Sequence, residues 1–73
     1  MNVEMWSLDK VTPYDKNPRA VSDKAVAKVA SSIEQFGFQQ AIVVDKDGVV
    51  IAGHTRLKAA VSLGLKEVPV KVA

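Results

Sequence analysis

The sequence predicts a small α+β domain whose elements follow the order β-α-β-β-α-β and form a mixed sheet. Two short runs of β-branched residues, 41–45 and 49–53, flank a Lys-Asp-Gly turn and indicate a hairpin. Two amphipathic segments, 23–36 and 55–63, carry apolar residues three and four positions apart, which is typical of helices that cover a core. Strand-like segments also stand at both ends of the chain, so helices and strands interleave and are expected to pack in layers.

The N-terminal segment 1–11 is predicted to be the first strand, because Val3, Met5 and Leu8 alternate loosely with polar residues. The stretch TPYDKNPRAVS that follows contains two prolines and an Asn-Pro step and shows no periodicity. Such a composition is typical of a loop. We therefore expect the strand to end before Pro13 and a long connection to lead to the first helix.

The first helix is predicted to lie between Ser22 and Gly37. The Ser22 hydroxyl can cap free amides of the first turn, and Asp23 suits the positive end of the helix dipole. Gly37 favours the left-handed conformation that ends many helices. The stripe expected to face the core consists of Val26, Val29, Ala30, Ile33 and Phe36.

The second helix is predicted over 55–63, directly after the strand 49–53, with Gly64 as its C-terminal cap. The segment EVPVKV, 67–72, is predicted to be the last strand. Pro69 cannot donate a hydrogen bond, which predicts that this strand lies at an edge of the sheet or has the proline at its start. The residues expected to be buried together are Val26, Val29, Ile33, Val43, Ile51, Leu57 and Val61.

Length and composition fit one domain spanning residues 1–73. Cysteine is absent and there is a single histidine, so neither a disulfide framework nor a Cys- or His-based metal site is expected. The N-terminus lacks the features of a signal peptide, and the apolar runs are too short to span a membrane, which predicts a cytoplasmic protein.

The net charge of +2 is too small to indicate nucleic acid by itself. The segment 16–28 is locally basic, which suits a solvated face or a phosphate-bearing partner.

Gly53, His54, Thr55 and Arg56 stand where a strand turns directly into a helix. The first amides of a helix lack partners within it, and with the helix dipole they favour an anion. Glycine leaves room for a phosphate at the backbone, Thr55 offers a hydroxyl, and Arg56 offers a planar fork of donors. His54 can donate one more hydrogen bond, more strongly when protonated. The pattern suits a phosphate cradle, and equally a plain turn in which Gly53 permits the bend and Thr55 caps the helix.

The segment GHTRLKAA, 53–60, resembles the Gly-Glu-Arg-Arg-x-Arg-Ala box of ParB-type chromosome-partitioning proteins. Gly53, Arg56 and Ala59 match the box, and Lys58 is a basic equivalent. His54 stands where those proteins carry glutamate, which changes the expected geometry around a metal and a triphosphate.

Two further segments resemble the same family. FGFQQAIVV, 36–44, is similar to its Gly-x-x-Gln-Pro box through Gly37 and Gln40, with Ala41 in place of the proline. The run from Asn17 to Arg19 resembles a shortened Asn-Pro-x-x-x-Arg loop. The boxes stand in the family's order over about residues 8–72. The stretch 33–70 is most similar to ParB N-terminal-like domains of phages and of proteins beside DNA methyltransferases.

This resemblance implies the ParB/sulfiredoxin fold, in which the Gly-x-x-Arg turn binds nucleotide phosphates. It implies CTP or another nucleotide with magnesium as cofactor, and nucleotide or DNA as partner. It also implies fusion to a DNA methyltransferase or a helix-turn-helix domain outside this chain. Sulfiredoxin activity needs a cysteine and is excluded. On this basis the phosphate-binding residues are Gly53, His54, Thr55, Arg56 and Gln40, with Asn17, Arg19 and Lys58 as further contacts.

Three functions remain open at the level of sequence. The first, which we favour, is a nucleotide- or phosphate-binding module that serves DNA partitioning, modification or its regulation. The second is an enzyme of the same fold, a CTPase or a ParB-like nuclease. Such chemistry would need carboxylates or a base, but the candidate carboxylates are scattered along the sequence: Asp15, Asp45, Asp47 and Glu67. We therefore assign no catalytic residue and no metal ligand. The third is a protein-interaction module with a vestigial site.

Overall fold

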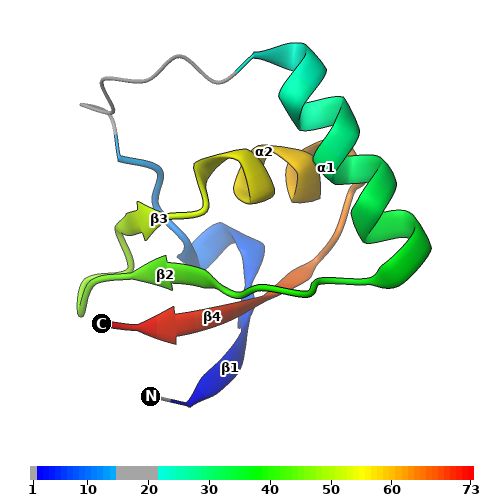
Figure 1. The fold of residues 1–73 in the computed structure, drawn as a ribbon. Helices are drawn as coiled ribbons and strands as arrows, with labels where there is room; N and C mark the ends of the chain where they lie inside the picture. Colours follow the sequence, from blue (N-terminus) through cyan, green and yellow to red (C-terminus); the bar gives the residue numbers. More distant parts are fainter. Residues whose placement is uncertain (1, 15–21) are drawn as a thin grey trace.

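A four-stranded mixed sheet carries α1 and α2 on one of its faces (Figure 1). The structure is a computed structural model that describes residues 2–14 and 22–73. The elements are β1 (Val3–Ser7), the 3₁₀ turn η1 (Leu8–Lys10), α1 (Asp23–Phe36), β2 (Ile42–Val44), β3 (Val50–Ala52), α2 (His54–Ser62) and β4 (Glu67–Val72). The predicted α+β class and the order β-α-β-β-α-β are confirmed.

The strands lie in the order β1-β4-β2-β3. β4 pairs antiparallel with β1 and parallel with β2, whereas β2 and β3 form the predicted antiparallel hairpin. The prediction that Pro69 puts the last strand at an edge, or stands at its start, is wrong, because β4 is central and Pro69 is its third residue. The ladder with β2 begins at Val70, one residue later. On that side Pro69 therefore has no ladder partner, and its missing N–H leaves no hydrogen bond unmade.

The N-terminal strand is shorter than predicted. β1 ends at Ser7, and η1 turns the chain so that Val11 becomes buried against the sheet. Thr12 then runs beside β3: its N–H donates to Gly48 O at 2.9 Å and its carbonyl accepts from Val50 N at 2.9 Å. This short contact covers part of the β3 edge.

α1 has the predicted caps, whereas the ends of α2 differ from the prediction. The Ser22 hydroxyl accepts from Ala25 N at 3.1 Å, and Gly37 follows α1 with φ +77°. α2 begins at His54, one residue before the predicted start, with Gly53 as its N-cap at φ +101°. Thr55 is therefore not the cap of this helix. At its C-terminal end, Leu65 N donates to Ala60 O at 3.1 Å across the left-handed Gly64.

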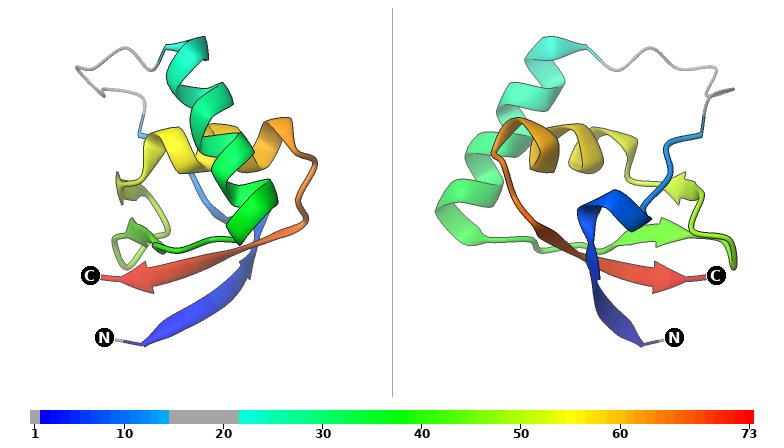
Figure 2. Two further views of the ribbon diagram at one scale, coloured as in Figure 1. Left: turned by 45° about the vertical axis from the view of Figure 1, so that its right-hand side comes forward. Right: turned by 180° about the vertical axis from the view of Figure 1, so that it is seen from behind.

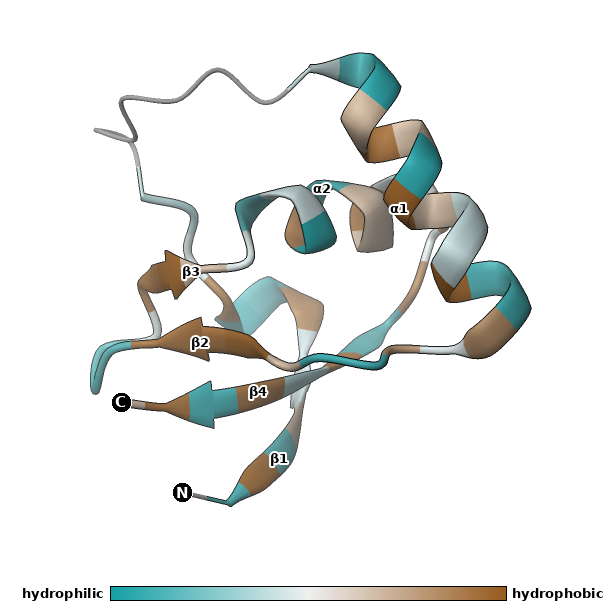
Figure 3. Ribbon diagram, in the orientation of Figure 1, coloured by the Kyte–Doolittle hydropathy of each residue, from teal (hydrophilic) through white to brown (hydrophobic). Residues whose placement is uncertain are grey.

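The core lies between α2 and the sheet. Four side chains are fully buried: Ile42 and Val44 from β2, and Val68 and Val70 from β4. Leu57 and Ala60 of α2 pack onto this layer, together with Val11 and Val50. Figure 3 shows how apolar residues follow β2 and β3 beneath α2. No helix among the described residues is long and apolar enough to cross a membrane.

The predicted set of buried residues is wrong in the sheet. Register between β2 and β3 shifts between Val43 and Val44, so Val50 pairs with Val44 and Ala52 pairs with Val43. This irregularity leaves Ile51 without a partner residue and 55% exposed, while Val43 points to the opposite face and is half-buried. Sequence alternation alone does not reveal such a bulge, because it inserts one residue into the period of two.

The prediction is also wrong for α1 and for Val61 of α2, whereas the predicted burial of Leu57 is confirmed. α1 packs mainly against α2 and makes few contacts with the sheet. Only Ala30 of α1 is buried, whereas Val26, Val29 and Ile33 are half-buried, and Phe36 is 68% exposed. On α2, Val61 is 60% exposed because Leu57, Ala59 and Ala60 form the inward face instead. A helix in an outer layer keeps its apolar stripe but buries less of it.

The second face of the sheet is not covered by either helix, as the three views of the ribbon show (Figures 1 and 2). Ladder partners share a face, so Ala52, Val43, Lys71 and Val3 form one row across β3, β2, β4 and β1. Val3 in this row is 53% exposed, and Met5, beside it on β1, is 60% exposed. We call this surface the open face.

Candidate functional site

The turn from β3 to α2 holds backbone donors in a fixed position. Gly53 is in the left-handed region, and its carbonyl accepts from Leu57 N at 2.9 Å, the first amide of α2 to find an acceptor. Within the described part of the chain, the amides of His54, Thr55 and Arg56 have no backbone acceptor. These three N–H groups and the helix dipole make the start of α2 attractive to an anion.

Two features of the structure favour glycine at position 53, apart from the room for a phosphate that the sequence predicts. A Cβ on this residue would lie 3.3 Å from Ile42 Cα and 3.4 Å from Arg56 Nη1. The space a side chain would take is therefore occupied by the neighbouring strand and by the guanidinium of Arg56. With φ at +101°, the backbone itself also favours glycine.

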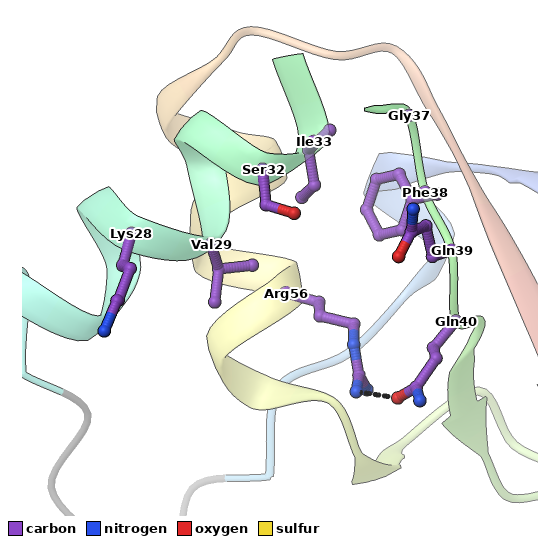
Figure 4. Close-up of a pocket in the computed structure, with 9 residues that line it drawn as sticks. All are labelled: Lys28, Val29, Ser32, Ile33, Gly37, Phe38, Gln39, Gln40 and Arg56. Atoms are coloured by element: carbon purple, nitrogen blue, oxygen red, sulfur yellow. Dashed lines mark hydrogen bonds between the residues drawn. The ribbon is translucent and has the colours of Figure 1, made fainter. Parts of the chain in front are cut away.

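The side chains of Arg56 and Gln40 are in contact near the point where β2 begins. Arg56 extends from the first turn of α2, and its Nη2 donates a hydrogen bond to Oε1 of Gln40, which lies just before β2 (Figure 4). Arg56 is half-buried and Gln40 is exposed. This contact orients the guanidinium while leaving other N–H donors free for a ligand, because an arginine carries five.

Two hollows meet at this contact. The first, the helix hollow, has a volume of about 450 Å³ and is lined by Lys28, Val29, Ser32 and Ile33 of α1, by residues 37–40 and by Arg56. Figure 4 shows these side chains around its opening. The second, the sheet hollow, measures about 510 Å³ on the open face and is lined by Val3, Val43, Ala52 and Lys71, by residues 39–41 and by Arg56.

The lining of both hollows is cationic. Lys28 and Arg56 line the helix hollow, Lys71 and Arg56 line the sheet hollow, and neither lining includes an Asp or Glu from the part of the chain that the structure describes. Among residues 2–14 and 22–73 no three His, Asp or Glu side chains gather as metal ligands. These residues fit an anionic ligand, but they do not fit a magnesium ion held by protein carboxylates, and we assign no metal site.

His54 has a buried polar atom that is not satisfied. Its Nε2 is shielded from solvent and has no hydrogen-bond partner among the described residues. A buried polar atom without a partner is unusual and calls for an explanation. Because His54 is the first residue of α2, beside the free amides, a ligand at the helix start is one partner that would satisfy it.

The structure brings only part of the predicted site together. Gln40 and Arg56 are in contact, Gly53 adjoins the Arg56 guanidinium, and His54 and Thr55 are half-buried in the first turn of α2. Lys58 is exposed and lines neither hollow. Asn17 and Arg19 lie outside the described residues, and so does Asp15. Asp45 has a local role in the hairpin, where its Oδ1 accepts from Asp47 N at 2.8 Å and from Val49 N at 3.0 Å.

Sequence reasoning did not single out Lys28, Ser32 or Lys71 as site residues. Lys28 belongs to the basic segment 16–28, for which both a solvated face and a phosphate-bearing partner are open, and its four-residue spacing from Ser32 puts both on one face of α1. Lys71 alternates with buried Val70 in β4, so its position on the second face could be predicted. Its proximity to Arg56 could not, because that depends on β4 being central.

The fold and this arginine-centred turn define the class: a domain of the ParB/sulfiredoxin type. The family model described as the ParB N-terminal domain matches residues 1–73, and the chain belongs to this family. Of the proteins similar to it, the ParB-like nuclease domain-containing protein YnaK of Escherichia coli is 42% identical over 65 residues, which cover 89% of this chain and 75% of that protein.

Two solved structures illustrate the likeness of fold. Sulfiredoxin from Arabidopsis thaliana matches with a TM-score of 0.88 and 26% identity, over 100% of this chain and 85% of that one. The C-terminally truncated chromosome-partitioning protein ParB from Caulobacter crescentus, solved with CTP-gamma-S, matches with a TM-score of 0.88 and 24% identity. The match covers 100% of this chain and 44% of the truncated chain in that structure. The predicted family and fold are thereby confirmed.

Proposed function

We propose that the domain binds a nucleotide or a nucleic-acid phosphate at the start of α2, with Arg56 as the main contact. The observation that carries this proposal is the position of the Arg56 guanidinium. It is held by Gln40 and adjoins Gly53, and Arg56 belongs to the first turn of α2, whose first three amides have no backbone acceptor among the described residues. Such a group can bind phosphate oxygens by two parallel hydrogen bonds without first being ordered.

The helix hollow has the size and lining expected for such a ligand. Its volume of about 450 Å³ is within the usual range for small-molecule sites, about 300–1,000 Å³. Val29 and Ile33 offer apolar surface for a base, while Lys28 and Ser32 offer polar contacts on the same wall. His54 lines neither hollow, so its contact with a ligand depends on binding at the free amides of the helix start.

CTP is the first nucleotide to test, because a ParB protein of the same fold was solved with CTP-gamma-S. A magnesium ion would have to be held largely by the nucleotide phosphates and water, since the described lining offers no carboxylate. By its family the domain would serve DNA partitioning, modification or its regulation. A methyltransferase or helix-turn-helix segment would be a fusion partner in that context.

The test is a titration of the folded domain with CTP, ATP and a short DNA oligonucleotide, with and without magnesium. Arg56→Ala should weaken binding about tenfold or more, since a charge-assisted contact is worth about 1.5–3 kcal/mol. Lys46→Ala is the matched control, because Lys46 is exposed in the β2–β3 turn and lines neither hollow. If the wild type binds none of these ligands, or if Arg56→Ala binds as well, the interaction-module alternative takes its place.

Nuclease or CTPase activity is the second candidate, since the similar E. coli protein is named for a nuclease domain. Such chemistry usually needs a metal or a positioned base. His54 is the side chain at the site that could move a proton. Turnover assays with magnesium, on the wild type and on His54→Gln, separate an enzyme from a binding module.

A further inference from the structure

The helix hollow and the sheet hollow share one wall. Gln39, Gln40 and Arg56 line both, so the Arg56–Gln40 contact stands between a groove along α1 and a hollow on the open face. A mononucleotide of the kind proposed above would occupy only one of the two. The sheet hollow, of about 510 Å³, would still be unexplained.

The cations of the two hollows follow one another along this path. Lys28 lies on α1 at one end, Arg56 lies at the shared wall, and Lys71 lies on β4 at the other end. Among residues 2–14 and 22–73 no Asp or Glu lines either hollow, so the described part of this path presents one sign of charge. A partner with regularly spaced negative charges is the complementary one.

Each hollow also has an apolar floor beside its cations. Val29 and Ile33 form that surface in the helix hollow. In the sheet hollow it is formed by Val3, Val43 and Ala52, which share a row with Lys71 across the four strands, a width of about 14 Å. Groups with a flat apolar surface could lie on these floors while charged groups contact the cations.

We propose that the two hollows form one continuous track for single-stranded nucleic acid. Its phosphates contact Lys28, Arg56 and Lys71 in turn, and its bases lie on the two apolar floors. The proposal extends the proposed function, since it includes the phosphate contact of Arg56. It adds a second half to the site, on the open face, and it makes an oligonucleotide rather than a mononucleotide the ligand that fills it.

The test compares ligands of different length on the same protein. An oligothymidylate of eight nucleotides should bind more tightly than dTTP. A plot of the logarithm of its association constant against the logarithm of the salt concentration should have a slope of about −2, because three phosphate contacts contribute about −0.7 each. Lys71→Gln should weaken binding of the oligonucleotide about fivefold to tenfold and reduce the slope by about 0.7. The same change should leave dTTP binding as it is. Lys46→Gln removes an equal charge outside both hollows and is the control.

The outcomes separate the two proposals. If dTTP binds through Arg56 while the oligonucleotide binds no more tightly and Lys71→Gln has no effect, the track is refuted and the mononucleotide site stands. If a blunt duplex of the same length competes equally with the single strand, the track is again refuted, because its floors need unpaired bases. If neither ligand binds, both proposals fall. Oligouridylate in place of oligothymidylate shows whether the track takes RNA as well as DNA.

Discussion

Arg56 donates a hydrogen bond from Nη2 to Oε1 of Gln40, sixteen residues earlier in the chain, and thereby joins the start of α2 to the start of β2. An amide oxygen holds the guanidinium without neutralising it. The arginine therefore keeps its full charge for a ligand while losing little side-chain freedom when the ligand binds. Gln40 in this arrangement is a positioning residue for Arg56.

Changing Gln40 to a carboxylate should remove this advantage. Gln40→Glu has nearly the same shape but places a negative charge on the atom that contacts Arg56. We expect phosphate ligands to bind about tenfold more weakly, because the carboxylate competes for the guanidinium and repels the ligand. Gln40→Ala should have a smaller effect of the same sign. Isothermal titration measures the affinities of both Gln40 variants. Gln35→Glu, on the exposed side of α1, is the control. Unchanged binding by Gln40→Glu would refute the role of Gln40.

Gly53 and Gly64 provide a matched pair for testing the turn. Both have positive φ, but a Cβ on Gly64 meets no atom within 4 Å, whereas one on Gly53 meets Ile42 and Arg56. Each change to alanine should destabilise the domain by about 1–3 kcal/mol through the backbone alone. Gly53→Ala should cost more than Gly64→Ala in urea unfolding and should also weaken ligand binding, because it displaces Arg56. Equal losses at the two positions would show that crowding at Gly53 is unimportant.

The core can be tested by comparing residues on one helix. Leu57→Ala should cost about 2–5 kcal/mol of unfolding free energy, since Leu57 is buried against β2 and β4. Val61→Ala, one turn later but exposed, should change it by no more than about 0.5 kcal/mol. Urea unfolding of the two variants measures the difference. A large loss at Val61 would support the core predicted from the sequence over the one in the structure.

The comparison of Leu57 with Val61 shows where sequence reasoning reaches its limit. Helix and strand types followed from local patterns, since caps such as Ser22 and turns such as 45–48 depend on neighbouring residues. Burial followed only in part: Leu57 is buried as predicted, but the burial of most other positions depends on what lies above and below their element. The exposure of Ile51 results from a register shift, and the half-burial of Val29 and Ile33 results from the packing of α1 on α2.

The candidate site could likewise be predicted only where its residues belong to local sequence motifs. Gly53, Arg56 and Gln40 stand in segments whose similarity to the ParB family is visible in the sequence, and two of them prove to be in direct contact. Lys28 and Lys71 could not be placed, because their approach to Arg56 requires α1 and β4 to be positioned around it. A tertiary arrangement of this kind leaves no local signal.

His54 tests whether the ligand reaches the start of α2. It is the first residue of that helix, and its Nε2 is buried without a hydrogen-bond partner among the described residues. A phosphate bound to the free amides at the helix start would lie beside this residue. We therefore expect removal of the ring nitrogens to weaken the binding of phosphate ligands.

The variant His54→Phe separates this role from a structural one. It removes both ring nitrogens, so the buried atom without a partner, which costs about 1–3 kcal/mol, disappears and the domain should be at least as stable as the wild type. Phosphate ligands should bind it several-fold more weakly, which isothermal titration of the two proteins measures. Equal affinities would mean that His54 does not contact the ligand, whereas a loss of stability with unchanged affinity would mean that it serves only the packing of the turn.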